Sequence, residues 1–270
     1  MKKKNLIIIV MLCILVLFLV INLFLFIQKD KINFKKVEKL ANQGIVEEQV
    51  SLGRLYYYGG GVEQNYEKAV YWFEKAAEQE YSEAQYNFAL MYYYGDGIEQ
   101  DFEKAKYWFE RAAAHEIAEA QYALGVMYYN GYGVEHDFEK AKYWYERAAE
   151  QGLSEAQYNL GWMYYYGKGV EVDYDKAFLW TEKSAMQGDA AAQSCLGKMY
   201  ANGQGVQQDY TKARELYEKS AAQDYALAQY RLGEMYAKGL GVTQDFAKAK
   251  EWYEKAAALG NEEATEAFRK

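Results

Sequence analysis

Residues that carry most enzyme chemistry are scarce in this sequence, which has two histidines, two cysteines and no proline in 270 residues. Cys13 lies in an apolar run and Cys195 in a repetitive region, so the two are not expected in one folded compartment and no intrachain disulfide is predicted. His115 and His136 occupy positions that glutamine fills elsewhere in the repetitive region, and both are interpreted as surface substitutions. Cys195 is interpreted as a tolerated helix residue rather than a nucleophile.

Nucleotide-binding and serine-enzyme motifs are also missing. Several Gly-x-Gly loops occur, but none continues into Gly-Lys-Ser or Gly-Lys-Thr, as a phosphate-binding loop would. No Ser-x-x-Lys is present, which removes the serine β-lactamase motif. We therefore predict that the protein is not an enzyme, with no catalytic, cofactor-binding or metal-binding residues, no cofactor and no small-molecule substrate.

One long apolar run is present, Leu6 to Ile27, and at about 1.5 Å rise per residue a helix of this length spans a bilayer. No Ala, Gly, Ser or Thr precedes Ala41, and signal peptidase needs small residues, so the run is predicted to stay as a transmembrane signal anchor. The flanking lysines favour a cytoplasmic C-terminal side, whereas the short basic start resembles a bacterial export signal. With the orientation left open, we expect a single-pass protein of the bacterial inner membrane whose remaining chain lies in the periplasm.

The remainder of the chain repeats with a period of 36 residues. Glycines mark the period at Gly61, Gly97, Gly133, Gly169, Gly205 and Gly241, and large apolar residues mark it at Trp72, Trp108, Trp144, Trp180, Leu216 and Trp252. A fixed period in this range predicts one supersecondary unit that is copied along the chain. Each copy buries its apolar face against its neighbours, so a linear array needs no separate second core.

Each copy is predicted to be a hairpin of two helices. The segment from Ser82 to Tyr94 has apolar residues at helical spacing, and Ser82 with Gln85 fits a capping box, as Ser154 with Gln157 does. The glycines that follow allow a tight reversal of the chain. Asp101 then stands where the second helix needs an N-cap, and the equivalent caps are Asn65, Asp137, Asp173, Asp209 and Asp245.

The pattern Ala-Gln-Tyr-x-Leu-Gly-x-Met-Tyr-x-x-Gly-x-Gly-Val-x-x-Asp-x-x-Lys-Ala-x-x-Trp-Tyr-x-x-Ala-Ala, seen from Ala120 to Ala149, resembles the Sel1-like repeat, a relative of the tetratricopeptide repeat. The resemblance implies an all-α fold, a right-handed α-solenoid of six 36-residue helix hairpins, here preceded by the N-terminal transmembrane helix. Two departures stand out. The proline that the family often places after Gly-x-Gly-Val is absent, and so are the paired cysteines of its secreted branch, whose β-lactam binding is therefore not implied.

The predicted organisation follows from the phase of the repeats. It comprises a basic tail (1–5), the transmembrane anchor (6–27), a juxtamembrane segment with a degenerate capping helix (28–45), six repeats (46–261) and a C-terminal capping helix (262–270). Terminal capping elements are a general requirement of solenoids.

One face of the first helices is the predicted partner-binding surface. Positions 84, 85, 88, 89, 91 and 92 are expected to form the packing face. The opposite side keeps large apolar residues, namely Tyr86, Leu90, Tyr93, Tyr122, Tyr129, Tyr158, Trp162 and Tyr165. In tetratricopeptide-like solenoids this side lines a concave groove for extended peptides, and exposed aromatic surface of this kind marks interaction sites. The alternative is that these tyrosines stack between neighbouring first helices.

The function that these features predict is that of a membrane-anchored adaptor with a protein or peptide partner. Nucleic acid is not an expected partner, because the formal net charge is −8 and an acidic surface repels phosphate backbones. An immunity-type protein that neutralises a secreted toxin at the membrane is an alternative. A third reading is an envelope enzyme acting on peptidoglycan or β-lactams.

Overall fold

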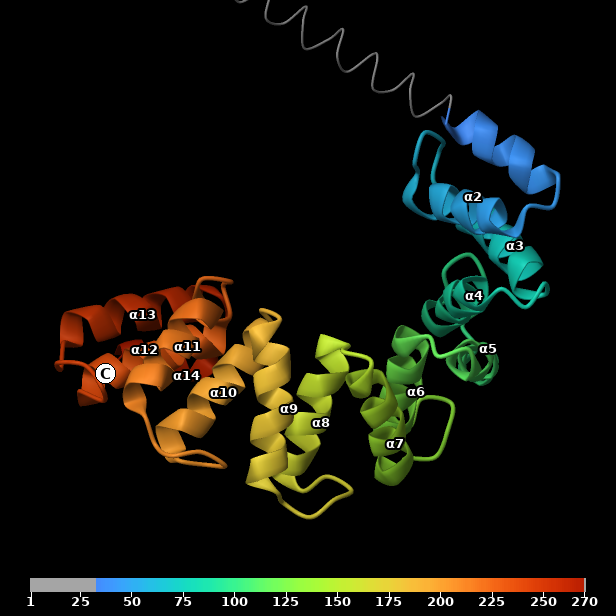
Figure 1. The fold of residues 1–270 in the computed structure, drawn as a ribbon. Helices are drawn as coiled ribbons and strands as arrows, with labels where there is room; N and C mark the ends of the chain where they lie inside the picture. The colour runs from blue at the N-terminus through green and yellow to red at the C-terminus, as the bar shows by residue number, and fades with distance from the viewer. Residues whose placement is uncertain (1–32, 270) are drawn as a thin grey trace, which may run out of the picture. The chain divides into compact units, whose positions relative to one another are not determined.

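The computed structural model describes residues 33–269, and every regular element with a described position is an α-helix. The chain divides into two compact units, Met1–Ile117 and Ala118–Lys270. Within each unit, helices that follow one another in the sequence pack against one another, as Figure 1 shows. The predicted all-α array of repeated helix hairpins is confirmed.

The first unit contains two complete hairpins. Residues 33–42 are helical and are followed by α2 (Val46–Tyr58), α3 (Tyr66–Ala77), α4 (Ser82–Tyr94) and α5 (Phe102–Ala114). The two helices of each hairpin pack together, and α3 also packs against α4.

The second unit contains four hairpins and a terminal helix. Its elements are α6 (Ala118–Asn130), α7 (Phe138–Glu150), α8 (Ser154–Tyr166), α9 (Tyr174–Met186), α10 (Ala190–Asn202), α11 (Tyr210–Ala221), α12 (Ala226–Lys238), α13 (Phe246–Ala258) and α14 (Glu262–Arg269). The last helix packs against α13, and its Ala264 is fully buried. Even-numbered helices from α6 to α12 are the first helices of their hairpins, so equivalent residues recur every 36 positions on the same face.

The predicted N-caps of the second helices are confirmed. In α7, the Asp137 carboxylate accepts a hydrogen bond from the Lys140 backbone N–H at 2.9 Å. The side chains of five further caps accept the same bond from the backbone N–H three positions later, namely Asn65, Asp101, Asp173, Asp209 and Asp245. A side-chain oxygen here satisfies a backbone donor that has no partner inside the helix. Each second helix therefore begins where the sequence predicts.

The predicted capping boxes are wrong. The N-caps of α4 and α8 are Tyr81 and Leu153, and neither makes a side-chain cap hydrogen bond. Gln157 is buried instead, where its amide donates to the Ala149 carbonyl at 3.0 Å and accepts from Gln187 at 2.9 Å. The glutamine turns inward because it satisfies a buried carbonyl at the end of the preceding second helix, and an unpaired carbonyl there would be costly.

The loop glycines sit in the left-handed region and approach neighbouring backbone closely. Gly205 has a φ of +68°, and a Cβ built on it would lie 2.6 Å from the Tyr174 carbonyl carbon. Only glycine meets both demands, because a side chain at this φ is strained and would also overlap the preceding repeat. The loop between α10 and α11 thus rests directly on the start of α9.

The predicted packing face is confirmed as buried. In α4 the six expected positions, Ala84, Gln85, Phe88, Ala89, Met91 and Tyr92, are all buried. The small residue in this face lets the second helix come close: a Cβ on Gly125 would lie 2.5 Å from a Tyr145 ring carbon. On the opposite side of α4, Tyr86, Leu90 and Tyr93 are only partly buried.

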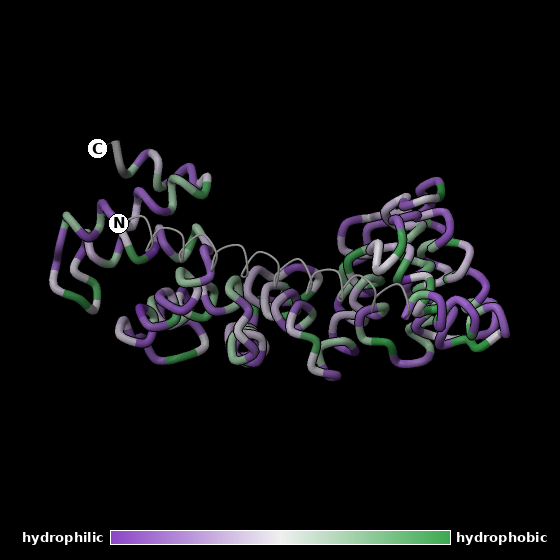
Figure 2. Tube along the Cα trace, turned by 90° about the horizontal axis from the view of Figure 1, so that it is seen from above, coloured by the Kyte–Doolittle hydropathy of each residue, from purple (hydrophilic) through white to green (hydrophobic). Residues whose placement is uncertain are grey.

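The prediction of a single-pass membrane protein with a periplasmic array is corrected. Within residues 33–269, no helix is both long enough and apolar enough to cross a membrane. Helices α2 to α14 have 8 to 13 residues, whereas a crossing takes about 20. Figure 2 shows that apolar stretches in this range are short and broken by polar residues. The expected anchor, Leu6 to Ile27, lies outside the described residues, and the membrane localisation is not retained.

Candidate functional site

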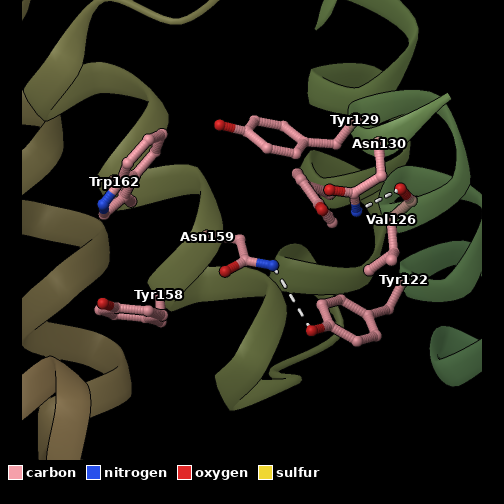
Figure 3. Close-up of a pocket in the computed structure, with 8 residues that line it drawn as sticks. Tyr122, Val126, Tyr129, Asn130, Tyr158, Asn159 and Trp162 are labelled. Carbon is pink, nitrogen blue, oxygen red and sulfur yellow. Dashed lines mark hydrogen bonds between the residues drawn. The ribbon is translucent and has the colours of Figure 1, made fainter. Parts of the chain in front are cut away.

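A pocket of about 320 Å³ lies between α6 and α8, on the side opposite the packing face. Its lining consists of Tyr122, Val126, Tyr129 and Asn130 from α6, Tyr145 from α7, and Tyr158, Asn159 and Trp162 from α8. We call this the aromatic pocket (Figure 3). It brings together four of the eight residues that the sequence predicts as partner-binding.

The aromatic rings of the pocket are held by contacts with one another and with the hairpin beneath. Tyr129 and Trp162 meet edge to face with ring centroids 6.1 Å apart. Tyr129 also packs on Phe138 at 5.1 Å, and Tyr122 packs on the buried ring of Tyr145 at 5.7 Å. Such aromatic pairs add to the free energy of burial. The walls are therefore preorganised, although Tyr129 and Trp162 remain partly exposed.

Asn159 stands between the aromatic walls and carries unused hydrogen-bonding capacity. Its amide nitrogen donates to the Tyr122 hydroxyl at 3.4 Å (Figure 3). Within residues 33–269, neither the Asn159 amide oxygen nor the Trp162 indole N–H has a hydrogen-bond partner. An extended backbone engages both acceptors and donors of this kind. The pocket thus combines apolar walls with polar groups that are available to a ligand.

Burial keeps the phenol groups of the pocket protonated. It raises the pKa of Tyr129, and it raises the pKa of Tyr158 more strongly because that side chain lies deeper. Both hydroxyls are consequently neutral donors and acceptors at physiological pH. The aromatic pocket carries no formal charge on any lining residue.

Tyr165 differs from the other predicted residues. Only 7% of its surface is exposed, and its hydroxyl donates to the Gln204 side-chain oxygen at 2.6 Å, in the loop of the following repeat. Its ring also packs against Tyr174 at 5.3 Å. Tyr165 therefore contributes to the packing of one repeat on the next, as the stacking alternative expects of such tyrosines.

The three predicted residues in the first unit lie on α4, apart from the aromatic pocket. Tyr86 and Tyr93 both pack on Phe109 of the same hairpin, with centroids 5.9 and 6.2 Å apart. Leu90 lines a smaller pocket of about 60 Å³ between α2 and α4, together with Tyr94. These contacts make Tyr86 and Tyr93 in part packing residues of their own hairpin.

Sequence reasoning missed the polar members of the site. Asn130 and Asn159 line the pocket, and Tyr166, which is 47% exposed, stacks on Trp162 with centroids 4.6 Å apart. The last position of the first helices reads Tyr58, Tyr94, Asn130, Tyr166, Asn202 and Lys238. Most of these residues, directly before the loop glycine, are tyrosine or asparagine. That preference was the sequence signal that could have predicted Asn130 and Tyr166 as members of the site.

The remaining candidate reactive residues lie outside this pocket. His115 and His136 are exposed, as their interpretation as surface substitutions expects. Cys195 lies on α10, where burial raises the pKa of its thiol to about 11. A thiol with such a pKa is protonated at neutral pH and is a weak nucleophile.

Comparison with known proteins identifies the repeats. The Sel1 repeat family model matches residues 49–81, 82–116, 118–153, 154–189, 190–225 and 226–261. A protective antigen of uropathogenic Escherichia coli strains, which displays an SLR fold, is 39% identical with a TM-score of 0.80 over 86% of this chain and 50% of its own. The chain thus spans half the length of that protein. A comparison with curated proteins finds no match.

Two further structures share the architecture. A Sel1 repeat protein from Oxalobacter formigenes is 34% identical with a TM-score of 0.73, over 84% of this chain and 99% of its own. An immunity protein from Pseudomonas aeruginosa is 21% identical with a TM-score of 0.51, over 77% of this chain and 81% of its own. At that identity the likeness to the immunity protein concerns the fold.

Proposed function

Because the chain belongs to the Sel1 repeat family, as six consecutive repeat matches establish, we propose that it is a protein-interaction module. In this proposal an extended peptide segment of a partner protein lies across α6 and α8. The segment inserts an apolar side chain into the aromatic pocket. Repeats of this kind generally act as interaction scaffolds rather than as enzymes.

One observation carries the proposal: the aromatic pocket joins partly exposed aromatic walls to an amide and an indole with free hydrogen-bonding groups. Its volume of about 320 Å³ suits one or two side chains of a peptide. Asn159 is placed to accept a hydrogen bond from a peptide N–H, and the neighbouring rings exclude water around that bond. Aromatic residues in such pockets are frequent hot spots of binding.

The test begins with a phage-displayed library of random peptides selected on the immobilised full-length protein. Selected peptides are then synthesised and their affinities measured by fluorescence anisotropy. The double variant Tyr129→Ala/Trp162→Ala is expected to weaken binding by at least about 2 kcal/mol, because hot-spot aromatics typically contribute that much.

A control tyrosine lies in the same unit, outside the pocket. Tyr143 on α7 is 50% exposed and lies outside the pocket, so Tyr143→Ala is expected to leave affinity unchanged. Circular dichroism checks that both variants are folded. Failure to select any peptide, or equal losses in the two variants, would overturn the proposal.

A further inference from the structure

A second pocket, of about 230 Å³, lies between α10 and α12, and its lining includes four charged residues. Its cations are Lys198, Arg231 and Lys238, and its single anion is Glu234. We call it the basic pocket. Three cations and one anion leave an excess of two positive charges, in a chain whose formal net charge is −8.

The ion pairs of the basic pocket all converge on Glu234. Its carboxylate accepts from Arg231 at 2.5 Å and from Lys238 at 2.6 Å. The pKa of Glu234 is lowered, because these bonds outweigh the burial that opposes its charge. One carboxylate thus holds two cations in place and neutralises only one of them.

Lys198 has no carboxylate partner within residues 33–269. Its ammonium group instead lies over Tyr165, 4.7 Å from the ring centroid, and donates to the Tyr166 hydroxyl at 3.4 Å. Burial opposes the charge of Lys198, but its contacts with the two tyrosines raise its pKa, so it is a cation at neutral pH. A half-buried cation without an anion is favourable to a ligand that brings one.

The basic pocket continues the aromatic pocket along the same face of the second unit. Trp162 stacks on Tyr166 with centroids 4.6 Å apart, and Lys198 lies 5.5 Å from the centroid of Tyr166. The repeat register agrees, because Lys198 stands 36 residues after Trp162 and Arg231 stands 72 residues after Asn159. A peptide that leaves the aromatic pocket past Trp162 therefore meets Lys198 next.

We propose that the peptide held by this unit is acidic: an apolar side chain fills the aromatic pocket, and Asp or Glu side chains of the same segment pair with Lys198 and with the one excess positive charge beside Glu234. The inference rests on the proposed function and names the chemistry of its partner. The overall negative charge of the chain does not oppose it strongly, because charges beyond about 8 Å are screened at physiological ionic strength.

The test uses three peptides with acetylated and amidated ends. Each has one tryptophan, and the residues that flank it on both sides are glutamate in the first, glutamine in the second and lysine in the third. Anisotropy with the full-length protein is expected to give at least about fivefold tighter binding for the glutamate peptide than for the glutamine peptide. The preference should shrink as salt is raised.

Two variants locate the preference. Lys198→Gln is expected to remove most of it, whereas Lys212→Gln is expected to keep it. Lys212 is a suitable control because its ammonium also lies over a tyrosine, Tyr200 at 5.1 Å, but on a second helix. Both variants lose the same charge from the same unit.

The outcomes separate this inference from the function on which it rests. If the peptides bind in a Trp162-dependent manner but glutamate, glutamine and lysine flanks are equivalent, the acidic preference is wrong and the interaction module stands. A preference that Lys198→Gln leaves intact also overturns it. Library-selected peptides whose binding is lost when the C-terminus is amidated, and is unaffected by internal glutamates, would overturn it in favour of recognition of the peptide end. If none of the peptides binds, and none is selected from the library, both proposals fail.

Discussion

In four repeats a buried glutamine of the first helix accepts a hydrogen bond from a glutamine that follows the second helix, but the second and last repeats lack this donor. Gln223 donates to the Gln193 side-chain oxygen at 3.0 Å, but 36 residues later the donor position is occupied by Leu259. The Gln229 side-chain oxygen is consequently buried without a hydrogen-bond partner among the described residues. A buried unpaired acceptor costs about 1–3 kcal/mol.

Leu259→Gln is therefore expected to stabilise the last repeat by about 1 kcal/mol, since it supplies the missing donor. Leu259 is 48% exposed, so little apolar burial is lost with it. Urea unfolding of the full-length protein measures the change. The reciprocal variant, Gln223→Leu, should destabilise the protein by about 1–3 kcal/mol, because it orphans the Gln193 oxygen. A destabilising Leu259→Gln would show that a glutamine at this position does not supply the donor that the Gln229 oxygen lacks.

Three aspartate caps of the second helices make stability depend on pH. At Asp101, Asp137 and Asp173, a backbone hydrogen bond from the residue three positions later holds the pKa of the carboxyl below its ordinary value of about 3.8. The folded state therefore binds fewer protons than the unfolded state near this pH. The caps stabilise fully above the ordinary pKa, and their contribution is lost as pH falls through the lowered folded-state pKa.

Replacing these three caps together by asparagine should flatten the loss of stability below about pH 4 while keeping the hydrogen bonds, as Asn65 does in the first repeat. Thermal melts from pH 7 to pH 2 compare the variant with the parent. An unchanged acid-side slope would mean that other carboxylates dominate acid unfolding.

A comparison of Gly188 with Gly205 distinguishes the cost of backbone strain from the cost of close packing in the loops. Gly205 and Gly188 both have positive φ, but a Cβ on Gly188 meets no atom within 4 Å, whereas one on Gly205 overlaps the Tyr174 carbonyl. Both alanine variants are expected to lose about 1–3 kcal/mol to strain. Gly205→Ala should lose more, because the backbone at the start of α9 must also move. Equal melting temperatures for the two variants would contradict the close contact of loop and helix.

The elements were predictable from the sequence because their signals are local and repeated six times. The cap of α7 by Asp137 depends on residues within one hairpin, and the glycine with positive φ at Gly205 recurs at the same position in every repeat. The capping box failed since Ser82 and Ser154 already lie inside the helix, and the glutamine instead serves a carbonyl of the preceding repeat.

Half of the predicted binding residues line the aromatic pocket, and the rest of the site depended on contacts between repeats. Asn159 reaches Tyr122 across 37 positions, and Tyr165 is buried by a bond to Gln204 across 39. Both contacts join different repeats, so the sequence pattern of a single repeat does not predict them. The absence of a carboxylate partner for Lys198 is likewise recognised only from the positions of the carboxylates on the neighbouring helices.

At the scale of the whole molecule, the two compact units are expected to respond differently to a ligand. All residues of the aromatic and basic pockets belong to the unit Ala118–Lys270. A peptide present at 100 times its dissociation constant stabilises the fold it binds by about 2.7 kcal/mol. Hydrogen exchange in α8 and α10 should therefore slow by about 100-fold where it requires unfolding of that unit, while exchange in α3 stays unchanged. Equal protection in α3 and α8 would contradict a site confined to the second unit.

The central claim, that the aromatic pocket holds a peptide, is tested most directly by photo-crosslinking from inside it. The full-length protein carries p-benzoylphenylalanine in place of Tyr129 or, as a control, in place of Tyr143, and each form is irradiated with a peptide from the library selection. Both positions bear a tyrosine in the same unit, but only Tyr129 lines the pocket. The account predicts a crosslink from position 129 that excess unlabelled peptide abolishes, and none from position 143. A crosslink from position 143 alone would place the peptide on the second helices and contradict the account.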